Sequence, residues 1–214
     1  MTENKKELNL VYTLEGKIYI NLTNLCSNRC VFCIRNNLNE IEGKNLWLKN
    51  ENFEASDVIN QFEEVIKENP KASETVYCGF GEPLLKPDIL IQTAKYIKEY
   101  YPDIKVRINT NGQGNLLAKR DLIPEIKDFI DEISVSLNAE NQEKYNEISK
   151  PADKENAYTA VKNFIKECSA AGINTTATVV SGFPNCGINL AECERVCHFL
   201  GAEFRVREWL PDGY

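Results

Sequence analysis

Three cysteines, Cys26, Cys30 and Cys33, lie close together in the N-terminal part of the chain, with the spacing Cys-x3-Cys-x2-Cys. A [4Fe–4S] cluster usually takes four thiolates, so a loop that supplies three leaves one iron with an open coordination position. Open positions are where metal sites carry out chemistry. The spacing therefore predicts an iron–sulfur cluster that takes part in catalysis.

Zinc is the alternative occupant of such a loop. A structural zinc site normally takes four nitrogen or sulfur ligands, but the only histidine, His198, lies far from the cysteines on an expected helix. A base-deaminase zinc site would need a His-x-Glu motif, which the sequence lacks. The ligand set favours iron–sulfur, and a non-catalytic iron–sulfur or zinc binding module remains as an alternative.

The segments that must position these cysteines alternate between strand-like and helix-like patterns. This alternation predicts parallel strands joined by right-handed crossovers. A full eight-unit barrel typically needs about 250 residues, and the chain has 214. We therefore expect an α/β fold, an open partial (β/α)6 TIM-like barrel with a short N-terminal hairpin. The expected strands are 10–13, 17–22, 75–78, 104–109, 132–137, 173–180 and 204–208, with helical patterns at 58–66, 87–101, 122–130, 161–168 and 190–200 and through Tyr145.

Polar and glycine-rich segments follow several of these strands. Ligands gather at the carboxyl ends of strands in sheets of this kind. The cysteine loop, Gly79–Pro83, Thr110–Gly112 and Asn138 all lie there. In the strand before Asn138, serines 134 and 136 share one face with it, and this polar row predicts a face that lines a site.

With Phe32 before its last cysteine, the Cys26–Cys33 motif resembles the signature of the radical S-adenosylmethionine (radical SAM) superfamily. The resemblance implies a partial barrel of the radical SAM type and a [4Fe–4S] cluster held by Cys26, Cys30 and Cys33. The fourth iron would bind the amino and carboxylate groups of S-adenosylmethionine. One electron, from an external donor such as a flavodoxin or ferredoxin, would yield methionine and a 5′-deoxyadenosyl radical that abstracts hydrogen from an unknown substrate.

The segment Gly79-Phe80-Gly81-Glu82-Pro83 resembles the superfamily's Gly-Gly-Glu motif, which binds the methionine ammonium. It departs at Phe80, where many relatives carry glycine. Because Phe80 is not expected in a left-handed conformation, we expect the loop shape to rest on Gly79 and Gly81. The alternative is an ordinary strand-to-helix turn with a carboxylate at its end.

Other positions take roles by the same resemblance. Ser136 and Asn138 would bind the ribose hydroxyls, and Lys150 would bind the carboxylate of S-adenosylmethionine unless it is a solvated surface lysine. One of the adjacent valines 179 and 180 would pack on the adenine; Val180 is our candidate. The segment Val106–Gly112, which contains Asn109 and Asn111, resembles a family motif that shapes the site.

Segments spread over nearly the whole chain look like short radical SAM proteins associated with TatD-family nucleases. This likeness implies one radical SAM core domain over residues 1–214, no cysteine-rich C-terminal extension, and a functional link to a TatD-family nuclease. It implies no substrate. An activase that installs a radical on a partner protein is therefore an alternative function. The likeness rests on residues 21–36, 46–48, 78–85, 106–112, 135–139 and 205–207.

The remaining features place the protein in the cytoplasm without a membrane partner. The chain has no signal-peptide pattern or bilayer-length apolar stretch, and its net charge of -7 argues against non-specific nucleic-acid binding. In that compartment, cysteines favour metal or redox chemistry over disulfides. Three further cysteines, at 168, 193 and 197, fall on apolar helical stripes and are expected in the core, whereas Cys186 lies in a loop. Arg205 and Arg207 share one face of the last strand, where they could hold a carboxylate or phosphate or simply charge an edge strand.

Overall fold

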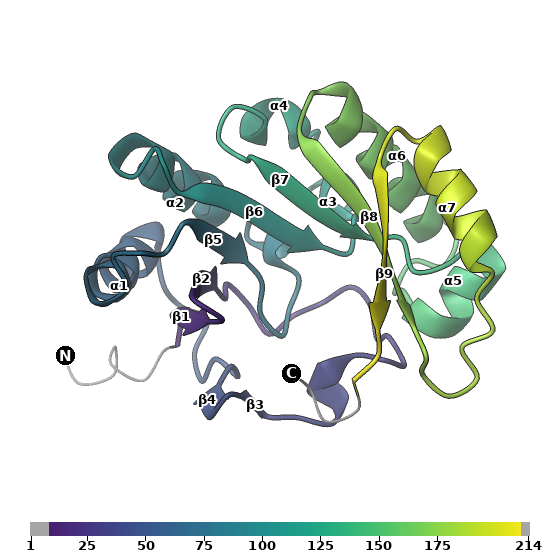
Figure 1. Cartoon of the computed structure of the whole chain (residues 1–214), viewed down its shortest axis with the longest axis horizontal. Helices are drawn as coiled ribbons and strands as arrows, with labels where there is room; N and C mark the ends of the chain where they lie inside the picture. The colour runs from purple at the N-terminus through teal and green to yellow at the C-terminus, as the bar shows by residue number, and fades with distance from the viewer. Residues whose placement is uncertain (1–8, 211–214) are drawn as a thin grey trace.

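The computed structural model describes residues 9–210, and its centre is a seven-stranded sheet (Figure 1). The strand order is β1-β2-β5-β6-β7-β8-β9. β1 pairs antiparallel with β2, and every later pair is parallel. The sheet thus has six parallel strands and an N-terminal hairpin, which share β2. This confirms the expected α/β architecture. The strands are β1 (Val11–Leu14), β2 (Lys17–Ile20), β5 (Glu74–Tyr77), β6 (Lys105–Thr110), β7 (Glu132–Ser136), β8 (Asn174–Ser181) and β9 (Glu203–Glu208).

Helices line one side of the sheet, and the cysteine loop lies with a small hairpin on the other side (Figure 1). The hairpin joins β3 (Glu40–Ile41) to β4 (Lys44–Asn45) through Glu42 and Gly43, both with positive φ, and the sequence did not predict it. None of the described helices is long and apolar enough to cross a bilayer. The helices are α1 (Ala55–Glu68), α2 (Pro87–Tyr100), α3 (Gly114–Ala118), α4 (Ile123–Ile126), α5 (Gln142–Ser149), α6 (Ala157–Ala170) and α7 (Leu190–Phe199), with short 3-10 turns η2 (Ile34–Asn36) and η3 (Pro83–Leu85).

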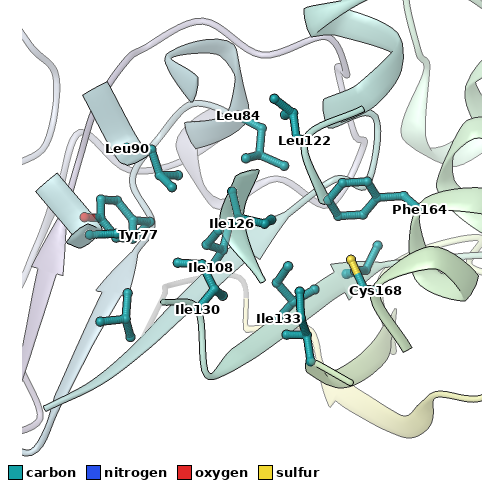
Figure 2. Packing of buried hydrophobic residues seen from close by; sticks show 14 of the residues in the cluster. Tyr77, Leu84, Leu90, Ile108, Leu122, Ile126, Ile130, Ile133, Phe164 and Cys168 are labelled. Atoms are coloured by element: carbon teal, nitrogen blue, oxygen red, sulfur yellow. The ribbon is translucent and has the colours of Figure 1, made fainter. Parts of the chain in front are cut away.

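The helical pattern expected over 122–130 is wrong in extent. Only the four-residue α4 forms there, preceded by the five-residue α3. The apolar residues of this segment are still buried (Figure 2), because a short turn of helix followed by a loop covers the same part of the sheet. Burial fixes which side chains face the core, but it does not fix the length of the helix.

The main core lies between the sheet and the helices (Figure 2). Tyr77 and Ile108 are paired across β5 and β6 and point into it. The phenol of Tyr77 is fully buried and lies 2.6 Å from the hydroxyl of Thr93 on α2, so its polar atom is satisfied. Cys168 on α6, together with Cys193 and Cys197 on α7, is fully buried, which confirms that these thiols belong to the core.

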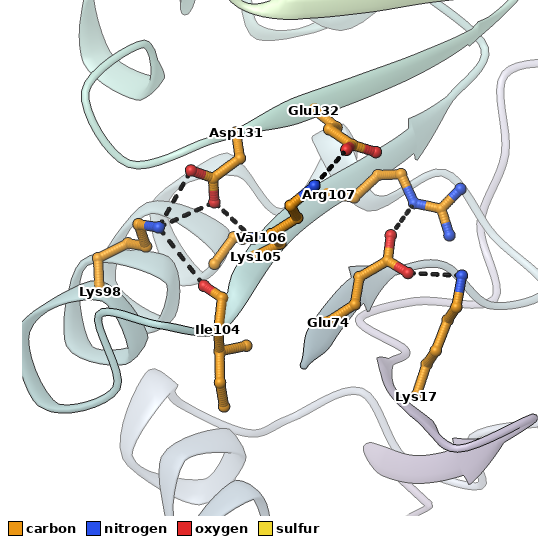
Figure 3. Close-up of polar contacts among 9 residues, drawn as sticks. All are labelled: Lys17, Glu74, Lys98, Ile104, Lys105, Val106, Arg107, Asp131 and Glu132. Carbon is orange, nitrogen blue, oxygen red and sulfur yellow. Dashed lines mark hydrogen bonds and ion pairs between the residues drawn. The ribbon is translucent and has the colours of Figure 1, made fainter. Parts of the chain in front are cut away.

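The opposite face of the sheet is polar, and ion pairs join its strands at their amino ends (Figure 3). Glu74 on β5 lies 2.6 Å from the ammonium of Lys17 on β2 and 2.7 Å from Nε of Arg107 on β6. The next pair, Lys105 with Glu132, joins β6 to β7 at 3.4 Å. A strand that is slipped by one residue would place these charges among the helices, so the pairs help to fix the register.

Candidate active site

The cysteine loop leaves β2 at the carboxyl end of the sheet and is held from two sides. On one side, the backbone N–H of Glu82 donates to the carbonyl of Leu25 at 2.8 Å. On the other, the N–H groups of Arg29 and Val31 donate to carbonyls at the end of α5, at 3.0 and 2.9 Å. The loop is therefore fixed between the segments that follow β5 and β7.

Polar side chains add further support from within. Arg35 donates from one terminal nitrogen to the carbonyls of Asn24 and Phe80, at 3.0 Å each. The carboxylate of Glu51 accepts from the hydroxyl of Thr23 at 2.6 Å and from the N–H of Asn24 at 2.9 Å. These bonds order the loop without involving a cysteine side chain.

The three thiols are partly buried. Burial, followed by the charges of Cys33 and Cys26, raises the pKa of Cys30 to about 12. Burial also raises the pKa of Cys26, and the nearby charge of Glu82 adds to the effect. Thiols in such surroundings become thiolates readily only when a positive charge is bound beside them. Bound iron would supply that charge, so the donor set fits a cluster.

Within residues 9–210, no three Cys, His, Asp or Glu side chains converge closely enough to hold a single metal ion. Cluster thiolates ligate different irons of one cube, so they need not point at a single atom. The arrangement thus differs from that of a preformed zinc site. The charges of Cys26 and Cys33 do act on Cys30, so the three thiols are close enough to influence one another electrostatically, and a larger inorganic core remains compatible with this loop.

Glu82 is buried at the centre of the loops that follow β5 and β6. Its carboxylate accepts from the N–H of Leu84 at 3.1 Å, the hydroxyl of Thr110 at 2.7 Å and the N–H of Asn111 at 2.7 Å. Burial outweighs these three donors and raises the pKa of Glu82 to about 7. In this arrangement Glu82 binds its own chain and orders the loop after β6.

The glycines around Phe80 are needed for close approach and not for positive φ. A Cβ on Gly81 would lie 2.2 Å from the carbonyl oxygen of Thr23, and one on Gly79 would lie 2.0 Å from the side-chain oxygen of Asn21. Neither glycine has positive φ. Phe80 itself is buried, with its ring 5.0 Å from that of Trp47, and Pro83 begins η3. The loop shape thus rests on Gly79 and Gly81, as expected, but for reasons of space.

A cavity of about 190 Å³ lies directly beside the cysteine loop. Phe32 and Cys33 line it from the loop, and Ser136 and Val180 line it from β7 and β8. Val179, by contrast, is fully buried in the core, so the choice between the two valines falls on Val180. The structure therefore brings together four residues that the sequence places in the site.

The other expected site residues lie around this cavity, and not all of them face it. Asn138 is buried with φ +63°, and its amide nitrogen donates to Ser149 at 3.3 Å. Asn111 donates to the hydroxyl of Ser27 at 2.8 Å and lies 3.7 Å from the sulfur of Cys26. Lys150 is exposed and lines a separate cleft with Cys26. Asn109 lines a cavity on the face of the sheet that lies away from the helices, called the concave face below.

A buried polar group behind the loop escaped sequence reasoning. The side-chain nitrogen of Gln113 donates to the side-chain oxygen Oδ1 of Asn28 at 2.7 Å and to the phenol of Tyr145 at 3.2 Å, and the side-chain nitrogen of Asn28 donates to the same phenol at 3.0 Å. These bonds join the cysteine loop to α5 and to the loop after β6. Gln113 directly follows Asn111-Gly112, and that position was the only available signal.

A family model described as the radical SAM superfamily matches residues 20–200. The chain belongs to the radical SAM superfamily. The superfamily's [4Fe–4S] cluster and S-adenosylmethionine are therefore its cofactors. No curated protein matches the chain, and the narrower likeness to TatD-associated proteins stays a prediction.

Several solved structures share the fold of the chain. Streptococcus suis SuiB bound to S-adenosylmethionine is 18% identical, with a TM-score of 0.66 over 90% of this chain and 40% of SuiB. HydG from Carboxydothermus hydrogenoformans is 18% identical, with a TM-score of 0.54 over 97% of this chain and 48% of HydG. A radical SAM methyltransferase from Sphaerobacter thermophilus is 14% identical, with a TM-score of 0.53 over 92% of this chain and 68% of that protein. The chain thus spans less than half of SuiB and of HydG.

Proposed function

We propose that Cys26, Cys30 and Cys33 hold the [4Fe–4S] cluster, and that S-adenosylmethionine binds beside it in the cavity lined by Ser136 and Val180. When bound, the cluster and S-adenosylmethionine supply a 5′-deoxyadenosyl radical, which abstracts a hydrogen atom from the substrate. Val180 gives the adenine an apolar surface, and the hydroxyl of Ser136 binds the ribose. An external donor such as a flavodoxin or ferredoxin supplies the electron.

The observation that carries this proposal is the position of the cysteine loop. Three thiols, two of which raise the pKa of the third, Cys30, lie at the carboxyl ends of six parallel strands, next to a cavity lined by Phe32, Ser136 and Val180. Ligands of open parallel sheets bind at this end. The loop is fixed by Glu82 and Arg35 through backbone groups, so the thiols stay available for iron.

Anaerobic reconstitution with iron and sulfide, followed by an assay for 5′-deoxyadenosine with dithionite, tests the proposal. The wild-type chain is expected to bind close to four irons per chain on the cluster stoichiometry and to release 5′-deoxyadenosine. Cys26→Ala, Cys30→Ala and Cys33→Ala are each expected to lose the product. Cys186→Ala is the matched control, since it removes a partly buried thiol elsewhere, and it should keep both iron and product.

Each alternative predicts a different result. A non-catalytic binding module would bind iron or zinc and form no 5′-deoxyadenosine. An activase would form 5′-deoxyadenosine and leave a radical signal on a co-purified partner protein. The proposal is wrong if the three cysteine variants release as much product as the Cys186 control. We also propose a functional link to a TatD-family nuclease in the same pathway. A separate binding or co-expression experiment tests that link.

A further inference from the structure

The concave face of the sheet holds a second cavity, of about 410 Å³, which the proposed cofactor site does not use. Four cationic side chains line it, and among the described residues that line it Glu15 is the only carboxylate. The whole chain carries a net charge of -7. The residues that line this cavity are therefore mostly cationic, although the protein as a whole is acidic. The cations are Lys17, Arg107, Arg205 and Arg207.

The arginines come from strands that are not neighbours. Arg107 lies on β6, whereas Arg205 and Arg207 lie on β9, beyond β7 and β8. The side chain of Arg205 reaches back across the concave face and donates to the hydroxyl of Ser134 on β7 at 3.2 Å. Charges from both sides therefore face the same space. As expected, β9 is a charged edge strand; its two arginines are exposed and also line this cavity.

Arg107 is held in a defined orientation. Glu74 lies 2.7 Å from its Nε atom, and the two terminal nitrogens of the guanidinium point away from that carboxylate (Figure 3). With the carboxylate beside Nε, the terminal nitrogens form the outer part of a planar fork of donors, which suits a carboxylate or a phosphate. Glu74 also pairs with Lys17 at 2.6 Å and so partly neutralises that lysine.

The opposite wall of the cavity is apolar and aromatic. Tyr12 and Tyr19 stack with ring centroids 5.4 Å apart, and Phe80 and Leu46 belong to the same cluster. Between the two walls, the carboxamide oxygen of Asn109 is buried without a hydrogen-bond partner among the described residues. A buried acceptor of this kind is costly unless a donor reaches it.

The cavity adjoins the proposed cofactor site. Ile34 and Arg207 line both this cavity and the smaller one beside Cys33. A molecule bound on the concave face would therefore lie next to the position where the radical is proposed to form. The size of the cavity suits a small molecule.

We propose that the substrate is a small organic oxyanion, a carboxylate or a phosphate with an apolar portion, and that this cavity binds it. Arg107, Arg205 and Arg207 hold the anionic group, and the tyrosines of β1 and β2 contact the apolar portion. The assignment of this cavity as the substrate site rests on the proposed function. The binding itself can be measured separately.

Calorimetry on the full chain, with its cluster reconstituted and S-adenosylmethionine present, tests the inference with three probes. Phenyl phosphate and benzoate each carry an anion and a ring, and inorganic phosphate carries the anion alone. Phenyl phosphate or benzoate is expected to bind more tightly than inorganic phosphate, and the stronger of the two identifies the anionic group. The double variant Arg205→Gln with Arg207→Gln should lose at least about tenfold in affinity for it.

Arg195→Gln is the matched control, because it removes an equal charge from α7, where Arg195 pairs with Glu192. It should bind the probes as the wild type does. The inference is overturned if the wild type binds none of the three, if the double variant binds as tightly as the wild type, or if the control loses as much. It is also overturned for Arg207 if Arg207→Gln weakens S-adenosylmethionine binding and leaves the probes unaffected.

The two proposals fail separately. If Cys26→Ala still releases 5′-deoxyadenosine, the proposed function falls, and the calorimetry alone decides the anion site. If the three cysteine variants lose 5′-deoxyadenosine but the arginine variants bind the probes normally, the anion site falls and the radical chemistry stands.

Discussion

The carboxylate of Glu82 accepts a hydrogen bond from the backbone N–H of Asn111 at 2.7 Å, which joins the loops after β5 and β6. Asn111 in turn donates to Ser27 within the cysteine loop. One buried carboxylate thus organises three segments that are distant in sequence.

Stability of the iron-free chain is expected to fall with rising pH because of Glu82. Burial raises its pKa from an ordinary 4.5 to about 7, so the folded state holds the proton over a range in which the unfolded state has lost it. The unfolding free energy then falls by about 3 kcal/mol between pH 4.5 and 7. Above pH 7, Glu82 causes no further change. Urea unfolding across this pH range measures the unfolding free energy of the wild type and of Glu82→Gln. The value for the wild type relative to the variant should fall by that amount as the pH rises. Parallel pH curves for the two proteins would contradict the assignment.

Gly81→Ala is expected to displace the cysteine loop. The new Cβ would lie 2.2 Å from the carbonyl oxygen of Thr23 and 2.5 Å from that of Leu25, and backbone atoms cannot rotate away. We expect a loss of at least about 2 kcal/mol in unfolding free energy and poor iron incorporation. Gly16→Ala is the control: its Cβ meets no atom within 4 Å, and only φ +75° is strained, which costs about 1 kcal/mol. Iron content should stay normal in that variant, and equal iron loss in both would refute the steric account.

Much of this site could be predicted because local patterns determine it. The parallel strands follow from alternating segments, and the loops that follow them must gather at one edge of the sheet. Residues such as Cys26, Gly81 and Ser136 lie at that edge simply because of where the strands end.

The remaining features depend on contacts between distant segments. The Gln113–Tyr145 bond spans 32 residues, and the Asn28–Tyr145 bond spans 117, so no local spacing announces them. The direction of Arg205 is a similar case, because parity places it on one face of β9 but cannot show that the face is concave. The short α4 arises because tertiary burial sets the end of the segment where periodicity suggested a longer helix.

Adjacent valines on β8 should separate stability from cofactor binding. Val179 is fully buried in the core, and Val180 lines the cavity beside Cys33. Val179→Ala should lower the unfolding free energy by about 2 kcal/mol and leave the affinity for S-adenosylmethionine unchanged. Val180→Ala should weaken that affinity roughly tenfold with little effect on unfolding. Equilibrium binding of S-adenosylmethionine and urea unfolding of both variants test this prediction. The reverse pattern would show that the adenine does not bind beside β8.

Glu74→Gln is expected to destabilise the fold more than Glu132→Gln does, although each removes one carboxylate from an ion pair on the same face. Glu74 serves two cations, and its side chain and that of Arg107 are only 12% and 13% exposed, so its loss leaves a largely buried guanidinium without its counter-charge. We expect about 2 kcal/mol of lost unfolding free energy, below the range for fully buried pairs because Lys17 is 40% exposed. Glu132 pairs with Lys105 at 3.4 Å, and those side chains are 30% and 65% exposed, so its removal should cost less than about 1 kcal/mol. Urea denaturation at low and high salt measures both, and a loss for Glu74→Gln that disappears at high salt would show a solvated pair instead of a buried one.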